Sequence, residues 1–294
     1  MQALTEIELS GLETFSKGKV RTVYDLGDML LIVASDRISA FDYILPTGIP
    51  DKGRVLTSLS SFWFKKLDPI VKHHMVTDDS AGFPESARAY GDLLRDRAML
   101  VHKAERIDFE CIVRGFITGS AWKEYEKHGT VAGEKIPPGL KKGDRLDRPV
   151  FTPSTKADDG HDRNISIAEM REAAGDADTD DIMSKSLAIF DMAQAYCGER
   201  GIVLVDTKFE FGKRDGEIIL IDEVLTPDSS RFWLGAPGED GPFALDKQFI
   251  RDYLEASGWD KNSPPPALPR DVVTEARRRY VMLYTALTGD SRFE

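Results

Sequence analysis

Hydrophobic and polar residues alternate along positions 203–211, and this two-residue period predicts a β-strand with one apolar and one polar face. The apolar face carries Val203, Val205, Thr207, Phe209 and Phe211, and the opposite face carries Leu204, Asp206, Lys208 and Glu210. A second, more continuously apolar strand is expected at 217–222, after the turn signal Asp215-Gly216. The stretch therefore predicts a β-hairpin, and its second strand ends in the charged pair Asp222-Glu223.

The register of this hairpin depends on the length of its loop, because opposed residues of an antiparallel pair share a face. A three-residue loop, Arg214 to Gly216, would pair Glu210 with Leu220 and Lys208 with Asp222. Asp206, Lys208, Glu210 and Asp222 would then share one face. Three carboxylates around a lysine favour Mg²⁺ and phosphate, since Mg²⁺ prefers one or two carboxylates plus phosphate oxygens. A solvated sheet face with cross-strand ion pairs is the alternative.

Elsewhere the periodicity predicts a mixture of short strands and helices. Strands are expected at 20–25, 29–35, 99–103 and 109–118, and helices at 54–67, 121–127, 167–174, 180–199, 247–256 and 271–287. Ser166 and Glu169 form a capping-box sequence before the helix at 167. Residues 131–162, rich in proline, glycine and charge, predict a long irregular connection, and a loop is expected after Trp233.

Composition and charge narrow the class of protein. The chain has 294 residues, 41% hydrophobic and 30% charged, which suits one large or two modest globular domains. Its net charge of -11 disfavours nucleic acid as a partner. We find no apolar run long enough to span a membrane and no signal-peptide pattern, and therefore expect a cytoplasmic protein. Cys111 and Cys197 show no pairing or metal-site spacing, so reduced thiols are expected.

Basic residues surround a glycine at the start of the first predicted hairpin. Lys17, Lys19 and Arg21 flank Gly18. A glycine beside basic residues on a hairpin can cover the phosphates of a nucleotide, although an exposed basic strand start gives the same pattern. Residues 104–108 predict a hinge, a usual place for a small-molecule cleft.

A second polar stretch lies at 110–125. Glu110 and Arg114 have even spacing on a predicted strand and face the same way. Ser120 is expected to be the N-cap of the helix that follows, and with Arg114 nearby it would suit a phosphate group. A capped helix with a surface ion pair is the alternative.

Several motifs occur together and in order: GKVRTVY at 18–24, SDRISAFD at 35–42, ECIVRGFITGSAWKEY at 110–125, FTPSTKADDGHD at 151–162, DTKFEFG at 206–212, DEVLTPDSSRFW at 222–233 and DKQFIRDYL at 246–254. With them the sequence closely resembles the longer form of the phosphoribosylaminoimidazole-succinocarboxamide synthase (SAICAR synthetase) family. The resemblance covers nearly the whole chain, and ECIVRG and DTKFEFG are its most specific motifs.

The resemblance implies a fold and a reaction. The fold is α+β, with an N-terminal antiparallel β-rich lobe at 1–105, a larger α/β lobe at 106–294, and ATP in the cleft between them. The family condenses L-aspartate with the carboxylate of carboxyaminoimidazole ribonucleotide and splits ATP to ADP and phosphate. This reaction gives SAICAR in de novo purine synthesis. ATP and Mg²⁺ are the implied cofactors, and small molecules the implied partners.

The resemblance also implies roles for individual residues. Lys208, Glu210 and Asp222 are implied to be catalytic, with Glu210 and Asp222 as Mg²⁺ ligands. ATP binding falls to Lys17, Gly18, Lys19, Arg21 and Lys103, and substrate binding to Arg114, Ser120, Asp158, Lys208, Arg231, Lys247 and Arg251. The chain departs from the family pattern at Thr22, where an acidic residue is expected, and at 156–162, which is one residue short. Asp158 and Asp159 are therefore alternatives for the aspartate near the base of the substrate.

The chemistry follows from the poor reactivity of a carboxylate toward an amine. We expect the substrate carboxylate to attack the γ-phosphoryl group of ATP, after which the aspartate amine displaces phosphate from the acyl phosphate. Two other classes share the basic hairpin and the carboxylates. One is a kinase-like ATP-dependent phosphotransferase, which would need a base for a hydroxyl acceptor that is not recognisable here. The other is a non-catalytic nucleotide-binding protein, which would bind ATP without turnover.

Overall fold

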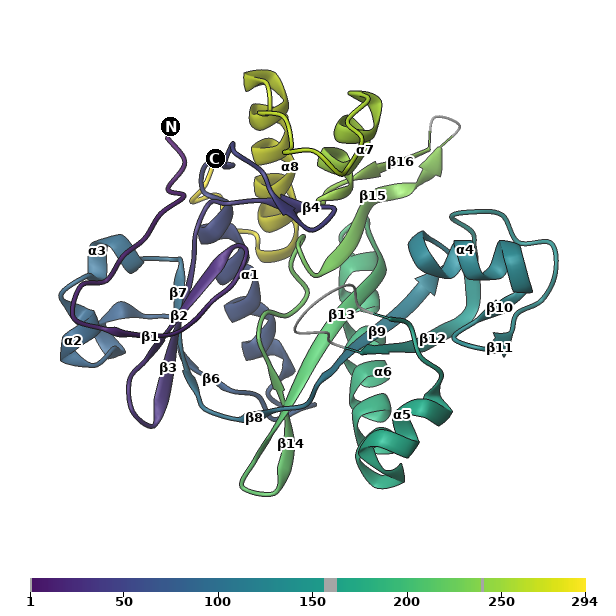
Figure 1. The fold of residues 1–294 in the computed structure, drawn as a ribbon, viewed down its shortest axis with the longest axis horizontal. Helices are drawn as coiled ribbons and strands as arrows, with labels where there is room; N and C mark the ends of the chain where they lie inside the picture. The colour runs from purple at the N-terminus through teal and green to yellow at the C-terminus, as the bar shows by residue number, and fades with distance from the viewer. Residues whose placement is uncertain (1, 156–162, 239–240) are drawn as a thin grey trace.

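The first of two large sheets is built from the N-terminal third of the chain. The computed structural model describes residues 2–155, 163–238 and 241–294. In this sheet the strand order is β1-β2-β3-β7-β6, and every neighbouring pair is antiparallel. The strands are β1 (Glu13–Lys17), β2 (Arg21–Asp25), β3 (Met29–Ala34), β6 (Met75–Thr77) and β7 (Ala98–His102). Figure 1 shows this sheet at the left of the molecule.

Both faces of the first sheet are covered, which explains the continuous apolar run of β3. Ile32 packs in the main core with residues of α1 (Lys52–Leu67), including Trp63. Leu31 and Val33 point to the other face and pack with Phe83. Successive residues of a strand point to opposite faces, so a strand buried on both sides needs apolar residues throughout.

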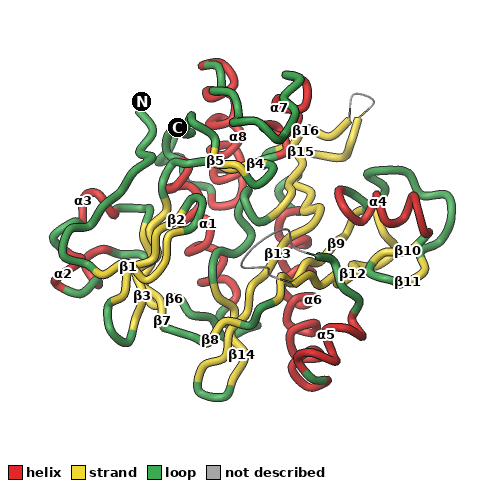
Figure 2. The backbone as a smooth tube through the Cα atoms, viewed as in Figure 1, coloured by secondary structure: helices red, strands yellow, loops and turns green. Residues whose placement is uncertain are grey.

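The second sheet has the order β12-β9-β13-β15-β16, with β14 and β8 also paired to β13. Its strands are β8 (Glu105–Arg106), β9 (Phe109–Phe116), β12 (Arg145–Thr155), β13 (Ile202–Arg214), β14 (Glu217–Ile221), β15 (Ser230–Gly238) and β16 (Gly241–Ala244). Helices α5 (Ile167–Ala174) and α6 (Asp176–Gly198) pack against its strands, as Figure 2 shows. Phe190 of α6 lies in the same core cluster as Phe209 and Phe211 of β13.

The remaining elements lie around these two sheets. They are β4 (Ser39–Ala40), β5 (Tyr43–Ile44), the 3₁₀ turn η1 (Ser80–Gly82), α2 (Glu85–Arg88), α3 (Gly91–Leu94), α4 (Gly119–His128), β10 (Thr130–Val131), β11 (Glu134–Lys135), α7 (Gln248–Ala256) and α8 (Arg270–Thr288). Helix α8 returns to the N-terminal part of the chain and packs against α1. The division into lobes at residue 105 stays a prediction.

The predicted α+β class is confirmed, and the predicted helices and strands match to within a few residues. The capping box at Ser166 and Glu169 is also formed. Two predictions of irregular structure are wrong. Residues 145–155 are not irregular but form the edge strand β12, in which Pro149 falls within a register shift. Proline is tolerated at sheet edges and bulges, so its presence did not exclude a strand.

The second wrong prediction is the loop after Trp233, where β15 continues and pairs with β16. This pairing depends on hydrogen bonds between strands and is not visible in local composition. Within the described residues, no helix is long and apolar enough to cross a membrane.

Candidate active site

Strands β9 and β13 place their polar residues on one face. In their register Asp206 lies opposite Arg114 and Lys208 lies opposite Ile112. The alternation of each strand therefore brings Glu110 to the same face as Glu210. The predicted polar face of β13 from Asp206 to Glu210 is thus formed.

The predicted alternation is wrong at the start of β13. A register shift between Leu204 and Asp206 against β15 inserts an irregularity there. Leu204 consequently packs in the main core, whereas Val203 and Val205 pack with Trp233 in a separate cluster. A bulge of this kind changes which face each residue takes without a clear mark in the sequence.

The predicted register of the β13–β14 hairpin is also wrong. Arg214 pairs with Glu217, and Glu210 pairs with Ile221 instead of Leu220. The loop therefore has two residues, Asp215 and Gly216, with φ values of 53° and 78°. Two-residue hairpin loops with positive φ at both positions are the type favoured by an Asp-Gly sequence.

Asp222 nevertheless reaches the site, because it no longer belongs to the strand. β14 ends at Ile221, and Asp222 has a left-handed φ of 65°. Arg21 Nη2 donates a hydrogen bond of 2.7 Å to Asp222 Oδ2 and lies 3.5 Å from Glu223 Oε1. Burial opposes the charge of Arg21, but Asp222, Glu223 and Glu210 together raise its pKa above the usual value.

Lys208 lies between two of the carboxylates. Its Nζ is 2.5 Å from Glu110 Oε1 and 3.4 Å from Glu210 Oε1. Burial would lower the pKa of Lys208, but the charges of Glu210, Glu110 and Asp222 raise it well above its usual value. The lysine is therefore a permanent cation at the centre of an acidic cluster.

The donor set of this cluster fits Mg²⁺ with phosphate. In the part of the chain that the structure describes, no group of three or more acidic, histidine or cysteine side chains is arranged to hold a metal ion alone. The predicted ligands are two carboxylates, a number that suits Mg²⁺ when phosphate oxygens complete its shell. Arg21 Nη1 is buried without a hydrogen-bond partner among the described residues, so a phosphate oxygen could satisfy it.

Two arginines form the next part of the polar face. Arg231 Nη1 lies 2.5 Å from Asp206 Oδ2, and Arg114 Nη1 lies 3.5 Å from the same oxygen. Arg114 also donates from Nη2 to Ser120 Oγ at 3.0 Å. Burial lowers the pKa of Arg114, an effect that Asp206 partly offsets. Two guanidinium groups sharing one carboxylate leave a positive charge that suits an anion.

The structure around these arginines corrects the predicted N-cap of α4 and explains why position 119 is a glycine. Ser120 is not the N-cap of α4. Thr118 occupies that position, and its Oγ1 donates to Asp206 Oδ2 at 3.1 Å. Gly119 has a φ of 54°, and a Cβ atom there would lie 2.8 Å from Arg231 Nη2. Only glycine allows Arg231 to approach the backbone this closely.

Lys247 contacts the buried side chain of Asp228, and the charge of Arg251 acts on the buried Asp246. Lys247 Nζ is 3.3 Å from Asp228 Oδ2, an oxygen that also accepts a 2.7 Å hydrogen bond from Lys52 Nζ. Burial raises the pKa of Asp246 to about 6, although two backbone N–H groups and the charges of Arg231 and Arg251 oppose the shift.

The residues predicted for ATP do not all come together. Lys19 Nζ pairs with Asp42 at 2.6 Å, and the Gly18 N–H donates to the Arg21 carbonyl, which closes the β1–β2 turn after Lys17. Lys103 instead pairs with Asp25, at the end of β2 opposite to Arg21. Asp158 and Asp159 lie outside the described residues.

Sequence reasoning missed several residues of this region. Glu110 and Glu223 stand out in the sequence but carry no individual predicted role, Asp206 is predicted only as part of the polar face, and Lys52 and Asp228 carry no prediction. The motif DEVLTPDSSRFW contains Glu223 and Asp228 and could have identified both. Lys52 had no such signal, because a single lysine at a helix start is usually exposed.

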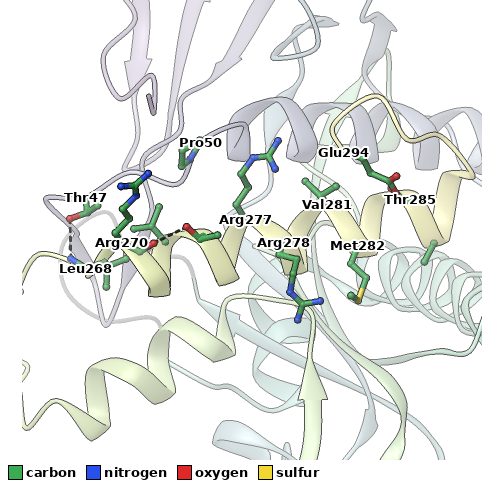
Figure 3. A pocket seen from close by; sticks show the side chains of 13 residues that line it. Thr47, Pro50, Leu268, Arg270, Arg277, Arg278, Val281, Met282, Thr285 and Glu294 are labelled. Carbon is green, nitrogen blue, oxygen red and sulfur yellow. Dashed lines mark hydrogen bonds between the residues drawn. The ribbon is translucent and has the colours of Figure 1, made fainter. Parts of the chain in front are cut away.

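A cavity of about 990 Å³ lies elsewhere, along α8 (Figure 3). Its wall is mostly apolar and includes Val281 and Met282, with Arg277 and Arg278 beside them. None of the residues predicted for ATP, metal or substrate lines it. We therefore place the candidate site on the polar face of the second sheet and not in this cavity.

An acidic cluster with a central lysine, next to paired arginines, is a site that suits an enzyme acting on phosphorylated and other anionic substrates. The family model described as SAICAR synthetase matches residues 14–266. Proteins named phosphoribosylaminoimidazole-succinocarboxamide synthase from Pelobacter propionicus and Elusimicrobium minutum are 49% and 52% identical. The first alignment covers 97% of both chains, and the second covers 92% of this chain and 94% of the relative. The chain belongs to the SAICAR synthetase family.

Solved structures agree with this assignment. SAICAR synthase from Saccharomyces cerevisiae, solved in complex with SAICAR, has 42% identity and a TM-score of 0.87, and the match covers 99% of this chain and 100% of the yeast chain. A second SAICAR synthase structure reaches a TM-score of 0.89 at 43% identity over 99% of this chain and 100% of its own. The predicted family and ligase function in purine biosynthesis are thereby confirmed, with ATP as the energy source, and a kinase-like phosphotransferase is not favoured.

Proposed function

We propose that the polar face of β9 and β13 is where this ligase joins L-aspartate to the carboxylate of carboxyaminoimidazole ribonucleotide. One observation carries this proposal. Glu210 lies 3.4 Å from Lys208 and Asp222 lies 2.7 Å from Arg21, and the charge of each carboxylate acts on both cations, although strand alternation alone would not bring Asp222 there. Such an arrangement of two carboxylates and two cations suits a Mg²⁺-bound polyphosphate.

The proposed reaction has two bond-making steps. A carboxylate oxygen of the ribonucleotide attacks the γ-phosphorus of ATP, and the bond to the bridging oxygen breaks to release ADP. The amine of L-aspartate then attacks the acyl carbon, and phosphate leaves with its bonding electrons. The amine loses a proton as the amide forms.

Residues of the chain position and neutralise these groups. Lys208 holds a proton on Nζ and donates to the transferring phosphoryl group and the substrate carboxylate. Arg21 supplies a second fixed cation through its buried Nη1. Mg²⁺ on Glu210 and Asp222 would neutralise the charge of the phosphates during transfer. Positioning and charge neutralisation are the main requirements of phosphoryl transfer.

The ribonucleotide is proposed to bind beside this cluster. Arg114, Ser120 and Arg231 would hold its phosphate, and the 3.0 Å contact of Arg114 with Ser120 supports a shared role. Lys247 and Arg251 would bind a phosphate or carboxylate, and Asp158 would lie near the base. The net charge of -11 repels anionic substrates, and the basic residues of the site overcome this repulsion locally.

The proposal extends to the nucleotide and the organisation of the chain. Lys17, Gly18 and Lys19 would cover the ATP phosphates with Arg21, and Lys103 would bind another part of ATP. The lobes at 1–105 and 106–294 would close on ATP from two sides. We also propose a cytoplasmic location and no binding to nucleic acid, for which the acidic composition gives support.

An ADP-release assay tests this function. The purified protein is given ATP, Mg²⁺, the ribonucleotide and L-aspartate, and each of the three substrates is then omitted in turn. Steady ADP release should require all three, and its rate should match the rate of SAICAR formation. Steady ADP release that did not depend on L-aspartate, with a phosphorylated product, would show a phosphotransferase and refute the proposal.

A further inference from the structure

We infer that His74 is a positioning residue for Asp222, acting on the backbone of the proposed Mg²⁺ ligand rather than on its carboxylate. The inference rests on the proposed function, in which Asp222 binds Mg²⁺. His74 lies 148 positions away in the chain, and its Nε2 is 3.1 Å from the carbonyl oxygen of Asp222. A carbonyl oxygen only accepts hydrogen bonds, so Nε2 carries the proton and donates it.

The contact falls on a residue whose backbone needs support. Asp222 has a φ of 65°, a conformation that residues other than glycine adopt uncommonly. The strand ends one residue earlier, so the β13–β14 ladder no longer fixes the peptide of Asp222. The direction of the Asp222 side chain depends on this backbone conformation. A hydrogen bond that fixes its carbonyl therefore also fixes where its carboxylate points.

His74 itself is held firmly enough to fix another group. Its side chain is buried, and its ring packs on Phe64 with the centroids 5.4 Å apart. Its backbone N–H donates to the Leu220 carbonyl at 3.0 Å, and its carbonyl accepts from the His102 N–H at 2.8 Å. Segment 72–74 thus connects the first sheet to the end of β14, and the imidazole extends this connection to Asp222.

Two anchors then hold Asp222 at different atoms. Arg21 binds the carboxylate at 2.7 Å, and His74 binds the carbonyl. Mg²⁺ would compete with Arg21 for the carboxylate oxygens, whereas the contact with His74 does not involve them. Partners that orient a metal ligand from outside the coordination shell typically change metal affinity 10–100-fold when removed.

Two substitutions of nearly equal shape separate this role from packing. His74→Gln keeps a nitrogen donor on a flexible side chain, and His74→Met replaces it with a group that cannot donate. The measurement is the Mg²⁺ concentration for half-maximal rate at saturating ATP, ribonucleotide and L-aspartate, together with the melting temperature. His74→Met should raise this Mg²⁺ concentration by about tenfold or more, and His74→Gln should restore most of the loss.

His73 provides a matched control. Its ring also packs on Phe64, at 4.7 Å, but its Nε2 faces Asp68 instead of Asp222. His73→Met should therefore leave the Mg²⁺ requirement close to that of the unsubstituted protein. His74→Leu is a second variant without a donor and serves if His74→Met does not fold.

The results can overturn the inference separately from the proposed function. Equal Mg²⁺ requirements for His74→Gln and the donor-free variants would refute it, whether or not the melting temperature falls. Asp222→Asn is measured in parallel as the test of the ligand itself. If Asp222→Asn left the Mg²⁺ requirement unchanged, the proposed ligand role of Asp222 would be wrong. A strong effect of Asp222→Asn with none from His74→Met would refute only the role of His74.

Discussion

Replacing Lys52 with methionine should lower the free energy of unfolding by about 3 kcal/mol. The side chains of Lys52 and Asp228 are 0% and 3% exposed, so water does not screen their 2.7 Å ion pair. Removing one partner of a buried pair costs about 3–5 kcal/mol, because the remaining charge loses its compensation. Lys247 at 3.3 Å and the Tyr280 hydroxyl at 2.9 Å remain on Asp228, which places the expected loss at the lower end.

The pH dependence of this loss has a definite sign. Burial would raise the pKa of Asp228, but Lys247, Lys52 and the hydrogen bonds of Lys52 and Tyr280 lower it well below the usual 3.8. A carboxylate whose pKa is lowered by folding stabilises the folded state fully at pH values above its pKa in the unfolded state. This stabilisation is lost as the pH falls toward its pKa in the folded state. The difference in free energy of unfolding between Lys52→Met and the unsubstituted protein should be complete at pH 7 and should become smaller below about pH 4.

Urea denaturation followed by circular dichroism at pH 7 measures the loss, and calorimetry should show a melting temperature lower by about 6–12 °C. Lys72→Met is the matched control. Its 2.5 Å pair with Glu217 joins side chains that are 70% and 54% exposed, so solvent and salt screen it. If Lys52→Met were as stable as the control variant, Asp228 would not depend on Lys52 for compensation, and the reasoning would be refuted.

Three further substitutions test the proposed site. Glu210→Gln should reduce kcat by at least about 100-fold, as expected for loss of electrostatic stabilisation, and should leave the circular dichroism spectrum unchanged; turnover near that of the unsubstituted enzyme at limiting Mg²⁺ would contradict the ligand role. Arg231→Ala should raise KM for the ribonucleotide, because its guanidinium is half of the paired-arginine site, and an unchanged KM would remove Arg231 from substrate binding. Gly119→Ala should also raise KM for the ribonucleotide, but by less, because the new Cβ would lie 2.8 Å from Arg231 Nη2 and displace the guanidinium. Equal KM values for Gly119→Ala and the unsubstituted enzyme would show that Arg231 tolerates the displacement.

Features that depend on short stretches of sequence were predictable. The alternation from Asp206 to Phe211 predicted a polar face and an apolar face, and the structure has both. The capping box at Ser166 and Glu169 is another example, because all its hydrogen bonds lie within four residues. Long motifs identified the family for the same reason, because each motif preserves the identities of many neighbouring residues at once.

Features that depend on partners far along the chain were not predictable. Lys52 is buried only because Asp228, 176 positions away, accepts its hydrogen bond. The strand β12 looked irregular because its prolines and charges are unfavourable in a central strand, whereas at a sheet edge they are tolerated. In each case the deciding interaction is tertiary, and no periodicity in the sequence records it.

The hairpin at 202–221 shows how a loop type assumed from the sequence can give the wrong register. We expected a three-residue loop with Gly216 at its left-handed position, which would also place Glu210 and Asp222 on one face. The dipeptide Asp215-Gly216 favoured a two-residue loop, and this local preference determines the register. Strand alternation determines the sheet face of a side chain only while its residue remains paired within the sheet. By ending β14 at Ile221 and giving Asp222 a left-handed backbone, the chain keeps the favoured turn and still brings the carboxylate to Arg21.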